Sequence, residues 1–205
     1  MVDDNQKMAP TERAKTLAIF ASGQGSTMDT IYRACAEGIL SAEIALLVSN
    51  QQNSGAVQKA KSKGIPLHVI ETNLAENQTP ADDELLKKLL ASNIDWILLL
   101  GYTRKISDKV LSKFKDRIIN THPSLLPKYG GKGFFGKKVH QAVLDSGDSV
   151  TGATVHLVNE EYDSGKILGQ VQVSVKPDDS LGSLEQRVKQ AEKIHLVEIL
   201  EALWQ

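Results

Sequence analysis

The stretch Ile118-Ile119-Asn120-Thr121-His122-Pro123-Ser124-Leu125-Leu126-Pro127 divides this chain into two patterns. Before it, short apolar runs alternate with helical patterns, whereas a glycine-rich loop and longer strands follow it. The stretch begins as an apolar strand, and residues i and i+2 of an extended segment point to the same side. Asn120 and His122 are therefore predicted to aim a hydrogen-bond donor and a titratable group at one small volume. For this pair alone, a strand-end cap beside an ordinary histidine is the commoner interpretation.

The apolar runs before this stretch predict a doubly wound α/β sheet. They are mostly continuous in hydrophobicity, as in strands that a parallel sheet buries on both faces. The predicted strands are Thr16–Ala21, Glu43–Ser49, Pro66–Ile70, Trp96–Gly101 and Arg117–Asn120. The predicted helices between them are Ser26–Glu37, Ser54–Lys63, Ala81–Ser92 and Ser107–Phe114. This repetition predicts a single, mostly parallel sheet with helices on both faces.

The C-terminal part of the chain has a different pattern. Lys128–Gly136 is glycine-rich and is predicted to be a mobile loop, followed by a helix over Lys138–Ser146. The strands Ala153–Val158 and Ile167–Val175 come next, and the second alternates valines with polar residues, which predicts an antiparallel C-terminal pair with one wet face. The last predicted helix, Ser183–Leu203, has an apolar face that should lie on the sheet. That face comprises Leu184, Val188, Ala191, Ile194, Val197 and Leu200 or Glu201.

Composition and charge restrict the class of protein. The chain has 205 residues, of which 41% are hydrophobic, and this length suffices for one full core. We expect a loose leader over residues 1–15 and one domain over residues 16–205. The net charge of −1 argues against a general binder of nucleic acids or membrane surfaces, and no apolar run approaches the ~20 residues of a membrane helix. The single cysteine, Cys35, excludes an intramolecular disulfide and a thiolate-rich metal site, so a cytoplasmic location is the default.

The first strand–helix turn, Ala21–Thr27, contains two glycines and three hydroxyl side chains. Backbone N–H groups at such a turn face outward, and the following helix N-terminus favours an anion. A dinucleotide fingerprint requires a glycine where Met28 stands and an acid where Ser49 and Asn50 stand, so it is absent. A phosphate monoester fits the turn best, and a plain tight turn is the alternative.

A second candidate site is the acidic loop Asn159–Gly165, although acidic residues before a glycine usually form only a solvated turn. Asp163 in this loop is expected to lie beside His122 and to raise the pKa of the imidazole. The remaining histidines lack metal-ligand spacing. We interpret His68, His140 and His195 as structural, and His156 stays ambiguous because its strand borders the candidate site.

These motifs together resemble the folate-dependent formyltransferases, and most closely those that act on glycinamide ribonucleotide in purine synthesis. The resemblance covers the chain from about Leu17 onward, and the Asn-x-His-Pro-Ser-Leu-Leu-Pro block is its most specific part. The segments that carry it are residues 22–26, 101–104, 120–128, 152–156, 163–165, 185–188 and Glu192.

The resemblance implies a role for each matching residue. It implies that Asn120, His122 and Asp163 are catalytic, that Gly25, Ser26 and Thr27 bind the phosphate, and that Lys189 and Glu192 bind the ribonucleotide. The implied folate-binding residues are Thr103, Arg104, Lys105, Ile106, Asn120, Asn159, Glu160, Glu161, Tyr162, Asp163 and, where many members have arginine, Gln78.

The implied reaction is formyl transfer from 10-formyltetrahydrofolate to the amine of phosphoribosylglycinamide. Asn120 and a protonated His122 are expected to stabilise the charged oxygen of the intermediate, and Asp163 is expected to keep His122 protonated. No metal is required, the partners are small molecules, and a monomer or homodimer is expected. We expect no additional domain of the kind that relatives acting on other substrates carry.

Four alternatives remain at this point. Two lie within the family: transfer to another amine acceptor, and hydrolysis of formyltetrahydrofolate. A nucleotide-dependent oxidoreductase is favoured only by the glycine turn, and Met28 weakens it. A non-catalytic ligand-binding domain would leave the pairing of Asn120 with His122 unexplained.

Overall fold

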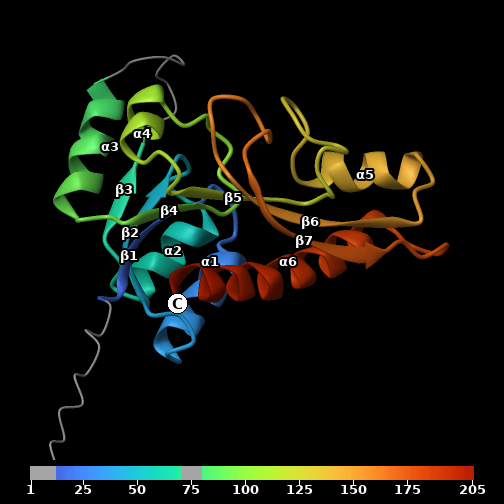
Figure 1. The fold of residues 1–205 in the computed structure, drawn as a ribbon, viewed down its shortest axis with the longest axis horizontal. Helices are drawn as coiled ribbons and strands as arrows, with labels where there is room; N and C mark the ends of the chain where they lie inside the picture. Colours follow the sequence, from blue (N-terminus) through green and yellow to red (C-terminus); the bar gives the residue numbers. More distant parts are fainter. Residues whose placement is uncertain (1–12, 71–79) are drawn as a thin grey trace, which may run out of the picture.

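The computed structural model describes residues 13–70 and 80–205, and within these residues seven strands form one sheet (Figure 1). The strands are β1 (Lys15–Phe20), β2 (Ala42–Ser49), β3 (Leu67–Val69), β4 (Trp96–Leu99), β5 (Ile118–His122), β6 (Val150–Leu157) and β7 (Ile167–Ser174). The helices are α1 (Ser26–Ala36), α2 (Gly55–Ser62), α3 (Pro80–Ala91), α4 (Asp108–Lys113), α5 (Lys137–Asp145) and α6 (Leu181–Trp204). The leader predicted over residues 1–15 lies almost entirely outside the described residues.

The order of the strands in the sheet is β3-β2-β1-β4-β5-β6-β7. The pairs from β3 to β5 are parallel, and β6 and β7 are antiparallel to their neighbours. The predicted fold class is therefore confirmed. Strand β5 continues to His122, beyond the predicted end at Asn120, because its last residues pair with β6. Strand β6 likewise begins at Val150 instead of the predicted Ala153.

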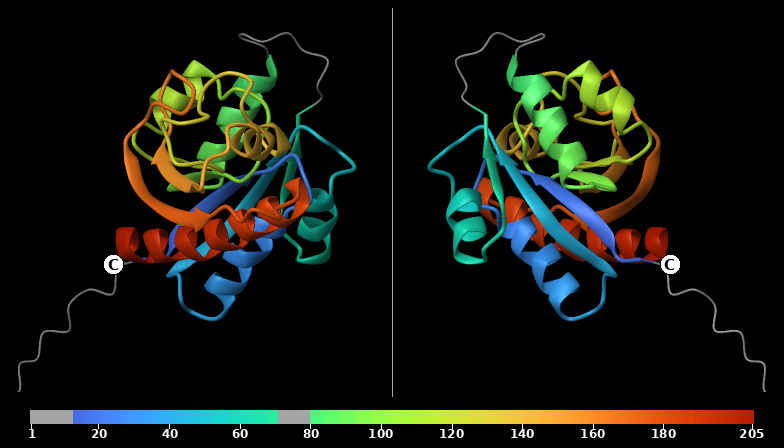
Figure 2. Two further views of the ribbon diagram at one scale, coloured as in Figure 1. Left: turned by 90° about the vertical axis from the view of Figure 1, so that its right-hand side faces the viewer. Right: turned by 90° about the vertical axis from the view of Figure 1, so that its left-hand side faces the viewer.

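Side chains of the central strands alternate between two hydrophobic cores. Leu17 and Ile19 of β1 pack on the face covered by α1, α2 and α6, whereas Ala18 and Phe20 face α3 and α4. Figure 2 shows helices on both sides of the sheet. Each fully buried large apolar side chain contributes roughly 1.5–3 kcal/mol to folding. Burial on both faces explains why these strands read as continuous apolar runs.

The prediction of the apolar face of helix α6 is partly wrong. Ile194 is 53% exposed, and the buried residues instead recur at every fourth position. They are Leu184, Val188, Glu192, Leu196, Leu200 and Trp204. Because a helix has 3.6 residues per turn, residues four apart do not lie directly above one another. The buried face therefore rotates gradually around the helix axis along α6. The first part of α6 packs with α5 and β6, and the last part packs with α1 and β1.

The strand order creates a crevice at the carboxyl ends of the parallel strands. From β1 the chain moves outward to β2 and β3 and then returns to β4 on the other side of β1. Loops that leave β1 and β4 therefore diverge, and ligands of doubly wound proteins bind at such a switch point. Gly25 follows β1, Thr103 follows β4, and Asn120 and His122 end β5.

Two properties of the described helices bear on the sequence expectations. Within residues 13–70 and 80–205, no helix is both long enough and apolar enough to cross a bilayer. Gln78, the implied folate contact, lies outside the described residues. Its role stays a prediction.

Candidate active site

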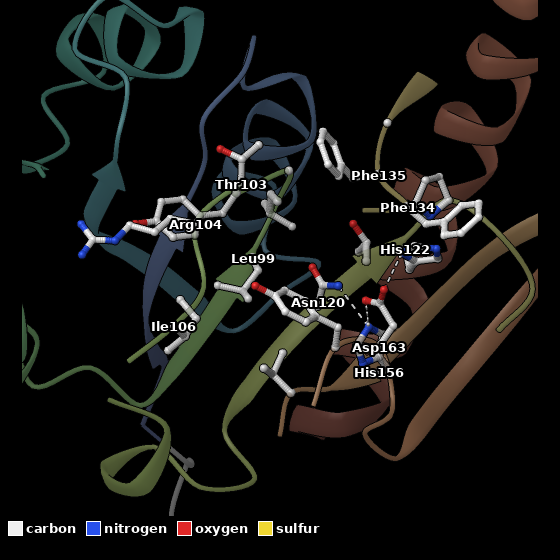
Figure 3. A pocket seen from close by; sticks show the side chains of 18 of the residues that line it. Leu99, Thr103, Arg104, Ile106, Asn120, His122, Phe134, Phe135, His156 and Asp163 are labelled. Atoms are coloured by element: carbon white, nitrogen blue, oxygen red, sulfur yellow. Dashed lines mark hydrogen bonds and ion pairs between the residues drawn. The ribbon is translucent and has the colours of Figure 1, made fainter. Parts of the chain in front are cut away.

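A cavity of about 500 Å³ opens at the switch point of the sheet (Figure 3). Its walls include all of the predicted site residues that the structure describes. These are Gly25, Ser26, Thr27, Thr103, Arg104, Lys105, Ile106, Asn120, His122, Asn159, Glu160, Glu161, Tyr162, Asp163, Lys189 and Glu192. Residues from five segments of the chain thus meet in one volume.

Asn120 is held by the strand that pairs antiparallel with its own. His156 of β6 lies directly opposite Asn120 in the register of the two strands. The Nδ1–H of His156 donates to the carbonyl oxygen of Leu157 at 2.8 Å, so Nε2 of the neutral ring is an acceptor. Asn120 Nδ2 donates to this Nε2 at 3.0 Å, as drawn in Figure 3. The contact fixes which end of the Asn120 amide carries hydrogens and leaves one N–H hydrogen for a ligand.

His122 is buried and held in one tautomer. Its Nε2 lies 2.8 Å from the carbonyl oxygen of Tyr129. A carbonyl oxygen only accepts hydrogen bonds, so Nε2 carries a hydrogen and Nδ1 of the neutral ring carries a lone pair. Nδ1 lies 3.5 Å from Oδ2 of Asp163. The lone pair of His122 and the Asp163 carboxylate therefore face the same part of the cavity.

The expected direction of the His122 pKa is wrong. Burial of the ring lowers the pKa of His122 below its ordinary value of 6.5, although the Asp163 carboxylate and the Tyr129 carbonyl oppose this shift. Nearby His156 lowers it further. Above this lowered pKa, His122 is neutral and can accept a proton at Nδ1. The geometry thus favours a base over the permanently protonated His122 that the sequence suggested.

Asp163 lies between two histidines and a backbone N–H group. Its Oδ2 accepts from the Gly131 N–H at 2.9 Å, and its Oδ1 lies 3.6 Å from His156 Nε2. Burial raises the pKa of Asp163, but the protonated forms of the two histidines, by the hydrogen bond of His156 and by the charge of both, and the Gly131 N–H lower it overall. Asp163 is therefore an ionised carboxylate beside the lone pair of His122.

The turn after β1 ends in a helix N-terminus without a side-chain cap. Gly25 is the N-cap residue of α1, with φ 69°, and among the described residues no side chain caps the first N–H groups of the helix. The acid in the first turn, Asp29, is paired with Lys59 at 2.6 Å and Lys63 at 3.1 Å. Uncapped N–H groups and a neutralised acid suit an anion at this end of the cavity.

Helix α6 supplies another part of the cavity wall, which carries an unusual carboxyl group. Glu192 is 8% exposed, and burial raises its pKa to about 7, while a hydrogen bond with Thr121 and the charge of Lys189 lower it. Such a shift is typical of functional sites. Lys189 on the same helix bonds Glu185 at 2.5 Å. This wall can therefore offer a proton-exchanging carboxyl group and a cation to one ligand.

The loop after β4 forms the opposite end of the cavity. The Thr103 N–H donates to Ser22 Oγ at 3.0 Å, which ties this loop to the turn after β1. The Arg104 guanidinium lies 3.8 Å from Asp82 of α3. Apolar side chains share this end with the loop and can pack on a flat ring of a ligand. They are Leu99, Ile106, Leu111 and Val158.

Of the cavity residues that were not among the predicted site residues, four bear directly on its chemistry. His156 was ambiguous, and its role depends on the antiparallel register with β5. His140 was interpreted as structural, but it lines the cavity and its Nδ1 is buried without a partner among the described residues. Phe134 and Phe135 of the glycine-rich loop also line it. The alternation of side chains along β6 indicates which face of the sheet His156 lies on, whereas no sequence signal indicates that His140 lines the cavity.

The chain is similar to a known protein family and to curated members of it. The sequence profile of the family described as "Formyl transferase" matches residues 15–200. The chain is 41% identical to the chloroplastic phosphoribosylglycinamide formyltransferase of Arabidopsis thaliana over 93% of its length, which covers 66% of that protein. It is 36% identical to the phosphoribosylglycinamide formyltransferase of Haemophilus influenzae over 87% of its length, covering 82% of that protein.

A solved structure supports the same relationship. Glycinamide ribonucleotide transformylase 1 of Geobacillus kaustophilus superposes with a TM-score of 0.86 at 34% identity, covering 94% of this chain and all of that one. The chain spans about two thirds of the length of the two chloroplastic relatives. In the part of the chain that the structure describes, no group of three or more His, Cys, Asp and Glu side chains is arranged to hold a metal.

Proposed function

Because the chain belongs to the formyl transferase family, we propose that it transfers the formyl group of 10-formyltetrahydrofolate to the amine of phosphoribosylglycinamide. The observation that carries the proposal is the convergence of Asn120, His122 and Asp163 beside an uncapped helix N-terminus in one cavity. Acyl transfer needs an oxyanion donor and a base, and a phosphorylated acceptor needs an anion site.

The proposed mechanism follows from the hydrogens that the geometry assigns. As the acceptor amine attacks the formyl carbon, negative charge develops on the formyl oxygen, and the free N–H of Asn120 stabilises it. His122 Nδ1 takes the proton from the attacking nitrogen and returns it to the leaving nitrogen of the folate. Asp163 stabilises the imidazolium while it holds the proton. Glu192 and Lys189 orient the acceptor.

A panel of acceptors tests the function. Purified protein is incubated with 10-formyltetrahydrofolate and either phosphoribosylglycinamide, another primary amine, or no acceptor, and tetrahydrofolate release is followed by absorbance. We expect release that depends on phosphoribosylglycinamide and an N-formyl product in the mass spectrum. Equal release without any acceptor would instead support hydrolysis, and activity only with another amine would replace the acceptor.

The phosphate end of the cavity gives a prediction for the turn after β1. A Cβ at Gly23 meets no atom within 4 Å, whereas one at Gly25 would lie 2.7 Å from Ala56 Cα. Gly23→Ala should therefore fold normally and crowd the ligand. We expect the KM for the ribonucleotide to rise about tenfold, as for one weakened charge-assisted hydrogen bond, with little change in the KM for the folate. Steady-state kinetics measure both, and an equal rise in both would contradict a phosphate site here.

The charge of Asp163 gives a prediction for the pH profile. In Asp163→Asn the carboxylate that opposes the effect of burial is lost, so the His122 pKa falls further. Since neutral His122 is the base, activity rises with pH through this pKa, and the acid limb of kcat/KM should move to lower pH. The plateau should fall at least tenfold because the imidazolium loses its partner. A limb at the same pH in both proteins would show that Asp163 does not act on His122.

We also propose that the protein works on small molecules in the cytoplasm, without nucleic acid, as a monomer or homodimer. The net charge of −1 supports the absence of nucleic acid among the partners, since binding to the phosphate backbone requires positive charge. Light scattering after size-exclusion chromatography measures the oligomeric state directly.

A further inference from the structure

The carbonyl group that fixes the tautomer of His122 belongs to a residue outside the cavity wall. Tyr129 lies in the turn after the Pro-Ser-Leu-Leu-Pro segment, and its backbone oxygen bonds the imidazole at 2.8 Å. If this carbonyl moved away, the neutral ring would be free to carry its hydrogen on Nδ1, where Asp163 would accept it. The ring would then have no lone pair toward the acceptor. The position of one backbone oxygen therefore decides whether His122 is a base.

The backbone of Tyr129 needs support from its surroundings. Its φ is 55°, which is in the left-handed region that a residue with a large side chain rarely adopts. Two residues later, the N–H of Gly131 donates to Asp163. The same short turn thus holds both His122 and Asp163, and its conformation must be stabilised from outside the turn.

The phenol of Tyr129 supplies this support through a polar cluster on the outer side of the turn. Its hydroxyl donates to Asp148 Oδ2 at 2.8 Å and lies 2.6 Å from Ser146 Oγ. Lys128 Nζ reaches both oxygens of Asp148 at 2.9 Å. The hydrogen bonds of Lys128 and Tyr129 lower the pKa of Asp148, which keeps its carboxylate a strong acceptor. The ring of Phe134 lies 6.3 Å from the Tyr129 ring.

We propose that Tyr129 and Asp148 are positioning residues, whose hydrogen bond holds the Tyr129 carbonyl against His122 and so maintains the tautomer with a lone pair at Nδ1. The consequence for turnover rests on the proposed function. The tautomer itself is a property of the free protein. This separation allows the two ideas to be tested independently.

The variant Tyr129→Phe removes the hydroxyl and keeps the ring. Long-range proton–nitrogen NMR spectra, with the His122 signals assigned by comparison with His122→Gln, report the tautomer at pH 8. We expect a single Nε2–H tautomer in the wild type and a mixture with Nδ1–H in the variant. The kcat should fall about tenfold, which corresponds to one hydrogen bond to a charged group, while both KM values stay within about twofold.

Matched variants separate positioning from general loss of structure. Asp148→Asn keeps an acceptor oxygen and should retain more of the wild-type tautomer and kcat than Asp148→Ala. Tyr32→Phe removes the same atom from α1, where the ring contacts Lys63, and should change neither quantity. The other titratable groups near His122 remain in place in all of these proteins; they are Asp163, His156 and His140.

An unchanged tautomer in folded Tyr129→Phe would overturn the proposal, whatever the activity. A fall in kcat without a change of tautomer would overturn it too, because the effect would not act through His122. Absence of formyl transfer by the wild type would refute the proposed function, and the NMR spectra would still decide the role of Tyr129.

Discussion

We expect replacement of Asn120 or His122 by alanine to lower kcat by about 10²–10³-fold. This is the usual effect of removing a hydrogen-bond donor to a developing oxyanion, as for Asn120, or a general base, as for His122. Neither replacement should unfold the protein, since each removes a side chain that faces the cavity. For Asn120→Ala the loss should lie in kcat more than in KM, because the free N–H acts on charge that is absent from the ground state. Steady-state kinetics of the formyl-transfer reaction, with circular dichroism to verify folding, measure this.

Two controls accompany these variants. Asn53→Ala changes an exposed amide before α2, and His195→Ala changes a histidine of α6 outside the cavity; both should keep wild-type turnover. A folded Asn120→Ala protein that retains turnover within tenfold of the wild type would remove Asn120 from the proposed oxyanion site. The same result for His122→Ala would leave proton transfer to another group.

Glu192→Gln should stabilise the protein at alkaline pH and weaken its function. Burial raises the pKa of Glu192 to about 7 in the folded protein, above its ordinary value of 4.5. Between these two values the folded state binds more protons than the unfolded state, so this group's stabilising contribution is lost as pH rises. At pH 8 the glutamine variant, which cannot ionise, should be more stable than the wild type by up to about 3 kcal/mol.

The pH dependence distinguishes this effect from a change in packing. Urea unfolding at pH 5, 6.5 and 8 should give a stability difference that grows with pH and is small at pH 5. Glu201→Gln, on the exposed side of the same helix, should show no such trend. The KM of Glu192→Gln for the ribonucleotide should rise, as expected of a buried carboxyl group with a functional role. A constant difference at all three pH values would show that Glu192 does not ionise within the buried site.

Local pattern was sufficient for much of this protein. Continuous apolar runs such as Leu17–Ala21 predict buried parallel strands because both faces of such a sheet are covered, and the observed cores on the two faces agree. The same-side geometry of Asn120 and His122 is a property of any extended segment, so both side chains reach the cavity as expected. The glycine turn after β1 is equally local, since two glycines before a helix expose its first N–H groups.

Contacts between distant parts of the chain decided the rest. The antiparallel register of β5 and β6 places His156 opposite Asn120, and no pattern within either strand specifies that register. The burial of Ile194 was wrongly predicted because the face of α6 rotates as the helix crosses a twisted sheet. The facing of Glu192 into the cavity follows from the same rotation.

The sequence alone determined which groups of the site exist, and the tertiary structure decided their protonation. An acid at Asp163 and an imidazole at His122 predict a raised pKa if only their charges are considered. The folded chain buries the ring, and removal from water outweighs the carboxylate, so the pKa of His122 is lowered instead. Loss of solvent depends on every element packed around a side chain. For that reason the sequence identifies the carboxyl group and the imidazole of this site, but only the fold determines where the proton lies.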